Sequence, residues 1–188
     1  MLKITSPHTK QELEDYYQFR WELLRKPWNY PPGSEKDEYE SVGRHIMIVD
    51  QDTQIKAVGR LQFNSNDEAQ VRHIAVANDS QGTGLGRMIL TALEQEAKSQ
   101  GAKRVVTNSR ENSIEFFRHC GYDVVGNAPN ELGALQRQQM VKELSSGEFI
   151  LRNPEWCREL QDTWHSEIPI TSQMGIRVYQ YTGGSFET

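Results

Sequence analysis

A strand, a polar turn, a glycine-rich loop and the start of a helix follow one another between residues 71 and 87. This order constrains the fold more than any other part of the chain. Residues 71–76 (VRHIAV) are rich in β-branched side chains, which favour strands, and residues 78–80 (NDS) have turn chemistry. Three glycines at alternate positions, 82, 84 and 86, then lead into a helical pattern. Glycine lets the backbone approach a ligand closely, and the first N–H groups of a helix attract anions, so the segment predicts a phosphate-binding loop directly after a strand.

Other phosphate-binding motifs fit this segment less well. A P-loop needs a Gly-Lys-Ser/Thr triplet, and none follows Gly82. A dinucleotide fingerprint needs its third glycine or alanine where Arg87 stands, and the upstream strands have the pattern of an antiparallel meander. A glycine-rich turn without a ligand is the remaining alternative.

Helix and strand patterns alternate along the chain up to residue 144. Apolar spacing predicts helices at about 10–25 and 85–100, and Asn112 followed by Glu115 predicts a capping box for a third helix. These patterns together indicate an α+β fold with a mostly antiparallel sheet. Short apolar or β-branched runs predict strands at 2–4, 45–50, 57–63, 71–76, 104–107, 122–125 and 136–144.

Composition narrows the classes of function. Lys and Arg number 21 against 26 Asp and Glu, so the net charge of −5 argues against a nucleic-acid-binding protein. No apolar run approaches the ~20 residues of a membrane helix, and residues 1–5 contain no signal-peptide block. Cys120 and Cys157 have no disulfide or metal-ligand spacing. We therefore expect a cytoplasmic protein without a metal and without a membrane partner.

The composition changes at residues 145–147 (SSG). We expect residues 1–144 to form one domain. Residues 145–188 then comprise a linker, a helix and a strand, which are too few elements to enclose a core of their own.

Two segments resemble the GNAT acetyltransferase family. Residues 81–86 (QGTGLG) resemble its acetyl-CoA motif, and residues 116–122 (FFRHCGY) resemble a second segment that follows at the family's spacing. The resemblance covers about residues 1–144. It implies the α/β/α-layered acyl-CoA N-acyltransferase fold, in which a mostly antiparallel sheet is splayed at the cofactor. It also implies transfer of acetyl from acetyl-CoA to a primary amine of a small molecule or peptide by direct attack.

The resemblance carries over a set of cofactor contacts. The loop backbone would hold the pyrophosphate, the strand ending at Val76 would pair with the pantetheine arm, and a backbone N–H near its end would polarise the thioester carbonyl. The implied cofactor-binding residues are Ile74, Ala75, Val76, Gln81, Gly82, Thr83, Gly84, Leu85, Gly86, Arg87, Asn112 and Phe116.

The proton-transfer positions depart from the family pattern. The usual base positions fall at Gln70 and Arg72, and the usual acid tyrosine falls at Phe117. Glu68 shares the strand parity of these positions and is the predicted base, acting through a water, with an exposed strand-end carboxylate as the alternative. His73 is chemically suitable, but regular alternation would direct it to the opposite face from residues 68, 70, 72, 74 and 76.

Other candidates are weaker. Arg110 stands at the family's asparagine position, where contact with a CoA phosphate and a surface charge are both open. His119 and Cys120 would point about 100° apart on a helix, so they do not form a nucleophile pair. The acidic stretch 35–40 favours a cationic acceptor, with a solvated loop as the alternative.

Residues 159–169 and 174–178 resemble the opening of a hotdog thioesterase-like domain of the kind found after GNAT domains. Only a first helix and strand would be present, so no thioesterase activity is expected of this chain. The alternative is a C-terminal arm that packs on the first domain or on a neighbour, and a homodimer is one assembly we considered. A CoA-binding regulatory module, or a scaffold for a thioesterase-like domain, is the alternative to an enzyme.

Overall fold

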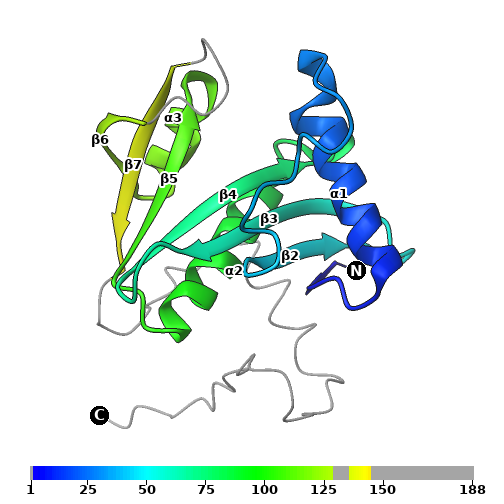
Figure 1. Ribbon diagram of the computed structural model, residues 1–188, viewed down its shortest axis with the longest axis horizontal. Coiled ribbons are helices and arrows are strands. Elements are labelled where there is room, and N and C mark those ends of the chain that lie inside the picture. The colour runs from blue at the N-terminus through cyan, green and yellow to red at the C-terminus, as the bar shows by residue number, and fades with distance from the viewer. Residues whose placement is uncertain (1, 129–135, 145–188) are drawn as a thin grey trace, which may run out of the picture. The chain divides into compact units, whose positions relative to one another are not determined.

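The fold is built on one mixed sheet. The computed structural model describes residues 2–128 and 136–144, and in these residues the strands lie in the order β1-β2-β3-β4-β5-β7-β6 (Figure 1). All neighbouring strands pair antiparallel except β4 and β5, which are parallel. The predicted α+β class is confirmed. The strands are β1 (Lys3–Thr5), β2 (Arg44–Val49), β3 (Ile55–Phe63), β4 (Glu68–Val76), β5 (Arg104–Arg110), β6 (Asp123–Asn127) and β7 (Arg137–Glu143).

The sheet opens between its two parallel strands. Pairing of β4 with β5 extends from Glu68 opposite Arg104 to Gln70 opposite Val106, and the strands then diverge (Figure 1). Residues 71–76 of β4 therefore line one side of a V-shaped opening, and the end of β5 lines the other. This is the splay that the family resemblance implied.

Helices cover both faces of the sheet. Helix α1 (Lys10–Leu24) packs on β3 and β4 from one side, whereas α2 (Leu85–Ser99) packs from the other, where α3 (Ile114–His119) also lies (Figure 1). A capping box starts α1, since the Thr9 hydroxyl accepts from the Glu12 N–H at 3.1 Å and the Glu12 carboxylate accepts from the Thr9 N–H at 2.9 Å.

The start of α3 differs from the prediction. A short 3₁₀ helix, η3 (Glu111–Ser113), takes the place of the predicted capping box, and α3 starts after Ser113 without a side-chain cap. Asn112 instead accepts a hydrogen bond from the Ser113 hydroxyl at 3.2 Å. The capping-box prediction was wrong because the chain tightens into a 3₁₀ turn before it becomes α-helical.

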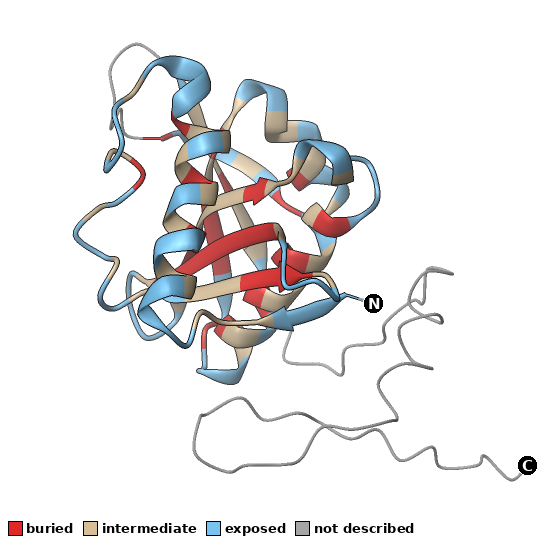
Figure 2. Cartoon of the chain, turned by 90° about the vertical axis from the view of Figure 1, so that its right-hand side faces the viewer, coloured by how far each residue is buried: buried red, intermediate tan, exposed pale blue. Residues whose placement is uncertain are grey.

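Each face of the sheet has its own apolar core, and Figure 2 shows buried residues gathered on the central strands. The larger core joins α2 and α3 to the sheet and includes Leu61, Val71, Ile89, Leu93 and Met140. The smaller core, under α1, contains Tyr16, Met47, Val49, Val58 and Ala75. Position 59 must be small, since a Cβ on Gly59 would lie 2.6 Å from the Leu93 side chain.

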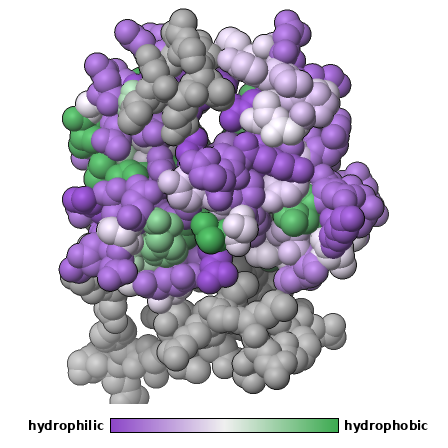
Figure 3. Space-filling model, in the orientation of Figure 1, coloured by the Kyte–Doolittle hydropathy of each residue, from purple (hydrophilic) through white to green (hydrophobic). Residues whose placement is uncertain are grey.

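The face of the molecule seen in Figure 3 is mostly hydrophilic where it is coloured, with small separated apolar patches. Among the described helices, none has both the length and the apolarity needed to cross a bilayer. The predicted tail elements at 145–188 lie outside the described residues, so the domain boundary stays a prediction.

Candidate active site

The glycine loop projects its backbone into open space. The chain leaves β4 at Val76, turns through η2 (Asn78–Ser80) and reaches α2 through residues 81–84. Gly82 and Gly84 have φ values of +77° and +90°, and a Cβ built on either would meet nothing within 4 Å. These angles favour glycine, and the surrounding space leaves the backbone accessible. Because Gly84 is the N-cap of a 15-residue helix and no side chain caps it, the segment has the form of an anion site.

Polar side chains of the loop hold its shape. The Thr83 hydroxyl donates to the Ser80 carbonyl at 2.6 Å, and the Gln81 amide nitrogen lies 3.2 Å from the Asn78 side-chain oxygen. Leu85 is buried in the larger core. The side chains that the resemblance listed as cofactor contacts are thus partly structural, which leaves anion recognition to the backbone.

Gly86 and Phe116 form the contact that brings α2 close to α3. A Cβ at Gly86 would lie 3.2 Å from the Phe116 ring, so a larger residue would push the two helices apart. Arg87, in the first turn of α2, reaches the His119 carbonyl at 3.4 Å. Asn112 is exposed in η3. The structure therefore brings the predicted residues of α2 and α3 to one end of the sheet.

The end of β4 presents backbone groups to the splay. The Ala77 N–H donates to the Lys56 carbonyl at 2.8 Å, toward β3. Because N–H directions alternate along a strand, the Val76 N–H points away from β3, into the opening. The Gln81 amide lies 3.5 Å from the Val76 carbonyl on that side. This geometry suits an extended ligand that pairs with β4.

A β-bulge at His73 changes which side chains share a face. His73 has φ +57°, and the β3–β4 register shifts between Val58 and Arg60. Consequently Arg72 and His73 both face Asp37, at 3.7 and 3.4 Å, while Ile74 packs in the core on the other side. Val76 also packs there. The predicted regular alternation was therefore wrong, because the extra residue of a bulge shifts the parity after it.

Beside the bulge lies a group that we call the buried ionic cluster: Arg20, Asp37, Glu40, Arg60 and His73. The fully buried Arg60 donates to both oxygens of Asp37, at 2.6 and 2.8 Å, and also contacts Glu40. The fully buried Arg20 donates to both oxygens of Glu40, at 2.9 and 3.0 Å. These bidentate pairs join α1, β3 and the loop between α1 and β2.

The cluster sets the protonation of its members. Burial alone would raise the pKa of Asp37, but hydrogen bonds from His73 and Arg60 outweigh it and hold that pKa far below the usual range. Burial holds the pKa of His73 well below 6.5, and nearby arginines add to the effect despite its hydrogen bond with Asp37. His73 is therefore a neutral imidazole at pH 7.

Asp37, Glu40 and His73 have the donor types of a metal site, and their potential ligand atoms lie within 4.8 Å of one another. The guanidinium groups of Arg20 and Arg60 already supply the positive charge that a cation would bring. The arrangement is an ion-pair network by its chemistry, and we assign no metal to it.

Glu68 lies far from this region. Its carboxylate accepts from Arg104 Nε at 2.7 Å and from the Asn64 side chain at 2.9 Å, at the end where β4 and β5 are joined. Five strand residues, or about 16 Å, separate it from His73. This position argues against the predicted role of Glu68 as base, because the carboxylate lies outside the splay.

The acidic stretch is also used internally. The buried Glu35 accepts from the Gly33 N–H at 2.8 Å, while Asp37 and Glu40 are paired with arginines. These three carboxylates do not offer free negative charge to a cationic acceptor, and the exposed Glu38 is the remaining acidic side chain of the stretch.

The ionic cluster escaped the sequence analysis, although two signals for it were present. Arg20 stands on the otherwise apolar face of α1, one turn after Tyr16, and Arg60 stands inside a strand of mostly apolar residues. A charged residue at a core position requires a buried partner. The partners lie in the acidic stretch 35–40, but nothing in the local sequence marked Asp37 and Glu40 as the carboxylates that pair with these arginines.

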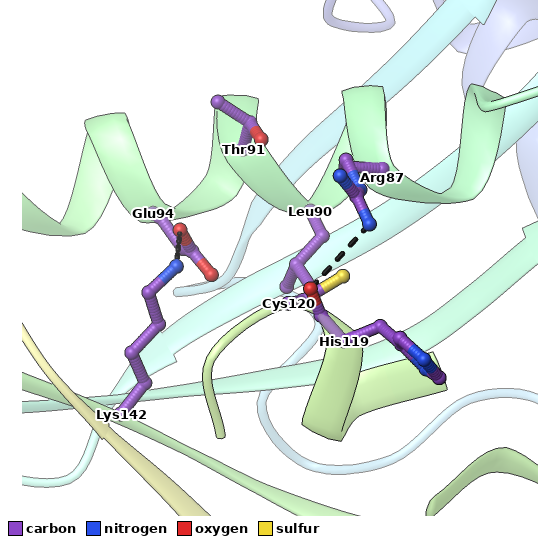
Figure 4. Close-up of a pocket in the computed structure, with 7 residues that line it drawn as sticks. All are labelled: Arg87, Leu90, Thr91, Glu94, His119, Cys120 and Lys142. Atoms are coloured by element: carbon purple, nitrogen blue, oxygen red, sulfur yellow. Dashed lines mark hydrogen bonds and ion pairs between the residues drawn. The ribbon is translucent and has the colours of Figure 1, made fainter. Parts of the chain in front are cut away.

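A second hollow lies between α2, the end of α3 and β7 (Figure 4), lined by Arg87, Leu90, Thr91, Glu94, His119, Cys120 and Lys142. Lys142 pairs with the buried Glu94 at 2.7 Å. Burial raises the pKa of the Cys120 thiol, and the His119 ring points away from its sulfur (Figure 4). The geometry agrees with the expectation that these two residues form no nucleophile pair.

Comparison with known proteins identifies the family. The model of the acetyltransferase (GNAT) family matches residues 13–122, more than half of the chain. The chain belongs to the GNAT family of acetyltransferases. A second model, for a thioesterase domain of the YiiD C-terminal type, matches residues 157–188. The resemblance to the GNAT family and the resemblance to a thioesterase-like domain are both confirmed. The second concerns residues that lie outside the described part of the chain.

Individual relatives agree with this assignment. An uncharacterized N-acetyltransferase of Bacillus subtilis, YjcF, is 27% identical over 143 residues, which are 76% of this chain and 100% of YjcF. A GNAT-family acetyltransferase from Staphylococcus aureus has a TM-score of 0.66 at 12% identity, covering 77% of this chain and 100% of its own. An aminoglycoside 6'-N-acetyltransferase complexed with coenzyme A has a TM-score of 0.64 at 15% identity, covering 79% and 99%. At these identities the structures establish the fold.

Proposed function

We propose that this GNAT protein transfers an acetyl group from acetyl-CoA to a primary amine. The observation that carries the proposal is the combination of the glycine loop with the β4–β5 splay. The exposed backbone of residues 82–84 offers an anion site at the start of α2, and the unpaired edge of β4 leads from it to the bulge. One fold relative, the aminoglycoside 6'-N-acetyltransferase, is a complex with coenzyme A, which supports the same ligand.

Each part of the site would have one task. The loop backbone binds the pyrophosphate of CoA, and the β4 edge orients the pantetheine arm by main-chain hydrogen bonds. The Val76 or Ile74 N–H polarises the carbonyl, which stabilises the negative charge that develops on its oxygen. When bound, acetyl-CoA supplies the activated acetyl group as a thioester. Holding it beside the amine then provides much of the acceleration.

We assign the proton-accepting role to His73 in place of Glu68. The bulge places His73 at the middle of the free β4 edge, on the face that carries α1. The Asp37 carboxylate lies 3.4 Å from Nε2 of His73 and can accept a hydrogen bond from a proton on that nitrogen. Nδ1 is then the unprotonated nitrogen, which accepts the proton of the amine. A neutral imidazole at pH 7 is the protonation state that a base requires.

The test is titration calorimetry of acetyl-CoA and CoA, followed by a thiol-release assay with a panel of primary amines. Binding of both, with thiol release that depends on an amine, is expected. No binding of either would overturn the proposal. Binding without turnover on any amine would favour the alternative of a regulatory CoA-binding module. The predicted homodimer, cytoplasmic location and domain boundary stay predictions.

A further inference from the structure

Arginine side chains gather at the open end of the splay, on the face that carries α1. Arg25, the C-cap of α1, is 7% exposed, and its Nε donates to the Ser34 carbonyl at 2.9 Å. Arg110 ends β5, and its guanidinium carbon lies 4.9 Å from the centroid of the Trp28 ring. Trp28 belongs to η1 (Lys26–Trp28), directly after Arg25, so this contact connects the two arms of the V.

The strand register adds a third charge at the same place. Arg137 on β7 is the cross-strand partner of Arg110, so the two side chains leave the sheet on the same face. Like charges directly opposite each other are destabilising. In a chain with a net charge of −5, such a gathering of arginines does not follow from composition.

Among the described residues, the carboxylates nearest to Arg25 and Arg110 are already paired with other groups. Asp37 and Glu40 are engaged by Arg60 and Arg20 in the buried ionic cluster. Within residues 2–128 and 136–144, neither Arg25 nor Arg110 forms an ion pair with a carboxylate. Burial, followed by the neighbouring Arg137, lowers the pKa of both Arg25 and Arg110. In the part of the chain that the structure describes, no carboxylate therefore pairs with either guanidinium group.

We propose that Arg25 and Arg110, with Trp28, bind an oxyanion on the acceptor, so that the preferred acceptor is a primary amine that also carries a carboxylate or a phosphate. This proposal rests on the proposed function and names the substrate class of the same site. Planar guanidinium groups suit both oxyanions because each can donate two parallel hydrogen bonds. The stack on Trp28 holds the Arg110 group in place, which limits the entropy lost on binding.

The site lies apart from the glycine loop. Arg110 and Trp28 are on the α1 face of the sheet, whereas the loop leads into α2 on the other face. The two anion sites would therefore receive different partners, CoA from one side and the acceptor from the other. The sequence left two roles open for Arg110, contact with a CoA phosphate or a surface charge. This placement favours neither, and we propose instead that Arg110 contacts an anion of the acceptor.

The experiment uses the full chain and pairs of amines matched except for the anion. An amino acid and its amide form the carboxylate arm, while aminoethyl phosphate and ethanolamine form the phosphate arm. We expect kcat/KM for the anionic member of at least one arm to exceed that of its neutral partner by about 10-fold or more, the value of a charge-assisted hydrogen bond. The arm that shows the preference identifies the anion.

Arg110→Met should reduce this preference to less than about 3-fold, with the Kd for acetyl-CoA unchanged within about twofold. Arg110→Lys keeps the charge without the planar fork and should keep part of the preference. Arg44→Met, at an exposed arginine of β2, is the matched control and should keep all of it. Thermal unfolding of each variant verifies that it is folded.

Failures of the two proposals can be distinguished. If acetyl-CoA does not bind, the proposed function fails. If acetyl-CoA binds and neutral amines react as well as anionic ones, only the oxyanion site fails. If no amine reacts, calorimetry of the same amine pairs with the CoA-bound protein decides. Tighter binding of an anionic member that Arg110→Met removes would support the site, and equal binding within a pair would overturn it.

Discussion

The glycine loop and the buried ionic cluster both adjoin β4, but they are built in opposite ways. The loop is a contiguous segment that acts through its backbone, with two glycines at positive φ and open space around them. The cluster consists of side chains from α1, the following loop, β3 and β4, with separations of up to 53 positions between Arg20 and His73. A backbone site needs only local sequence, whereas a side-chain site depends on packing between distant segments.

The largest expected effect concerns the cluster. Arg60→Met should destabilise the fold by about 3–5 kcal/mol, because it removes the bidentate partner of Asp37 and one of the two arginines that contact Glu40. Urea unfolding followed by tryptophan fluorescence measures the change.

The matched control is Arg104→Met, which removes the exposed ion pair with Glu68. It should cost no more than about 1 kcal/mol. Equal losses in the two variants would contradict the view that Arg60 is a structural ion of the core.

The next largest effect concerns the loop. Gly84→Glu should weaken CoA binding by about 100-fold or more, because it puts a carboxylate at the proposed pyrophosphate site. Titration calorimetry measures this loss.

Gly101→Glu controls for backbone strain. Gly101 also has positive φ, +96°, with open space around it, but lies after the other end of α2. Both variants should lose similar stability, and only Gly84→Glu should lose CoA. Full CoA affinity in Gly84→Glu would show that the loop is not the site.

A smaller effect concerns pH. The folded-state pKa of His73 is depressed, so below about pH 6.5 the unfolded chain binds more protons and stability falls. His73→Asn, which tolerates the positive φ, should therefore show a flatter fall in unfolding free energy between pH 7 and pH 5. Some dependence of stability on pH should remain in this variant, because burial also lowers the pKa of His45.

Below about pH 4 both proteins should lose stability, the His73→Asn variant less steeply because it lacks the His73 hydrogen bond that helps to lower the pKa of Asp37. The pKa of Asp37 is depressed in the fold, so its contribution is present above the unfolded-state pKa and is lost as the pH falls toward the folded-state value. Urea unfolding at several pH values measures both ranges. Parallel curves for wild type and His73→Asn from pH 7 to 5 would argue against a neutral buried His73.

The smallest expected effect is that of Glu68→Gln. Glu68 is paired with Arg104 at the joined end of the strands, so kcat/KM for acetyl transfer should change by less than about twofold. Removal of a true general base costs about 100-fold or more. A loss of that size would show that Glu68 is the general base and would contradict the assignment of this role to His73.

Local sequence was sufficient for much of the fold. Residues 81–87 specified the loop and the start of α2, since positive φ at glycine and a helix start are properties of neighbouring residues. Apolar periodicity located α1 and α2 to within a few residues. β4 begins at Glu68 and β5 extends to Arg110, both beyond their predicted bounds, because cross-strand hydrogen bonds continue past the apolar runs.

Only the tertiary structure decided which side chains meet. After the bulge at His73, the side chains of β4 point to the opposite faces from those that regular alternation predicts. The residue type at position 73 does not indicate a bulge. Arg20 and Arg60 required buried partners, but their choice of Asp37 and Glu40 depended on how the loop before β2 folds over the sheet. Backbone conformation is set by neighbouring residues, whereas electrostatic pairing is set by distance in space, and that distance exists only after the chain has folded.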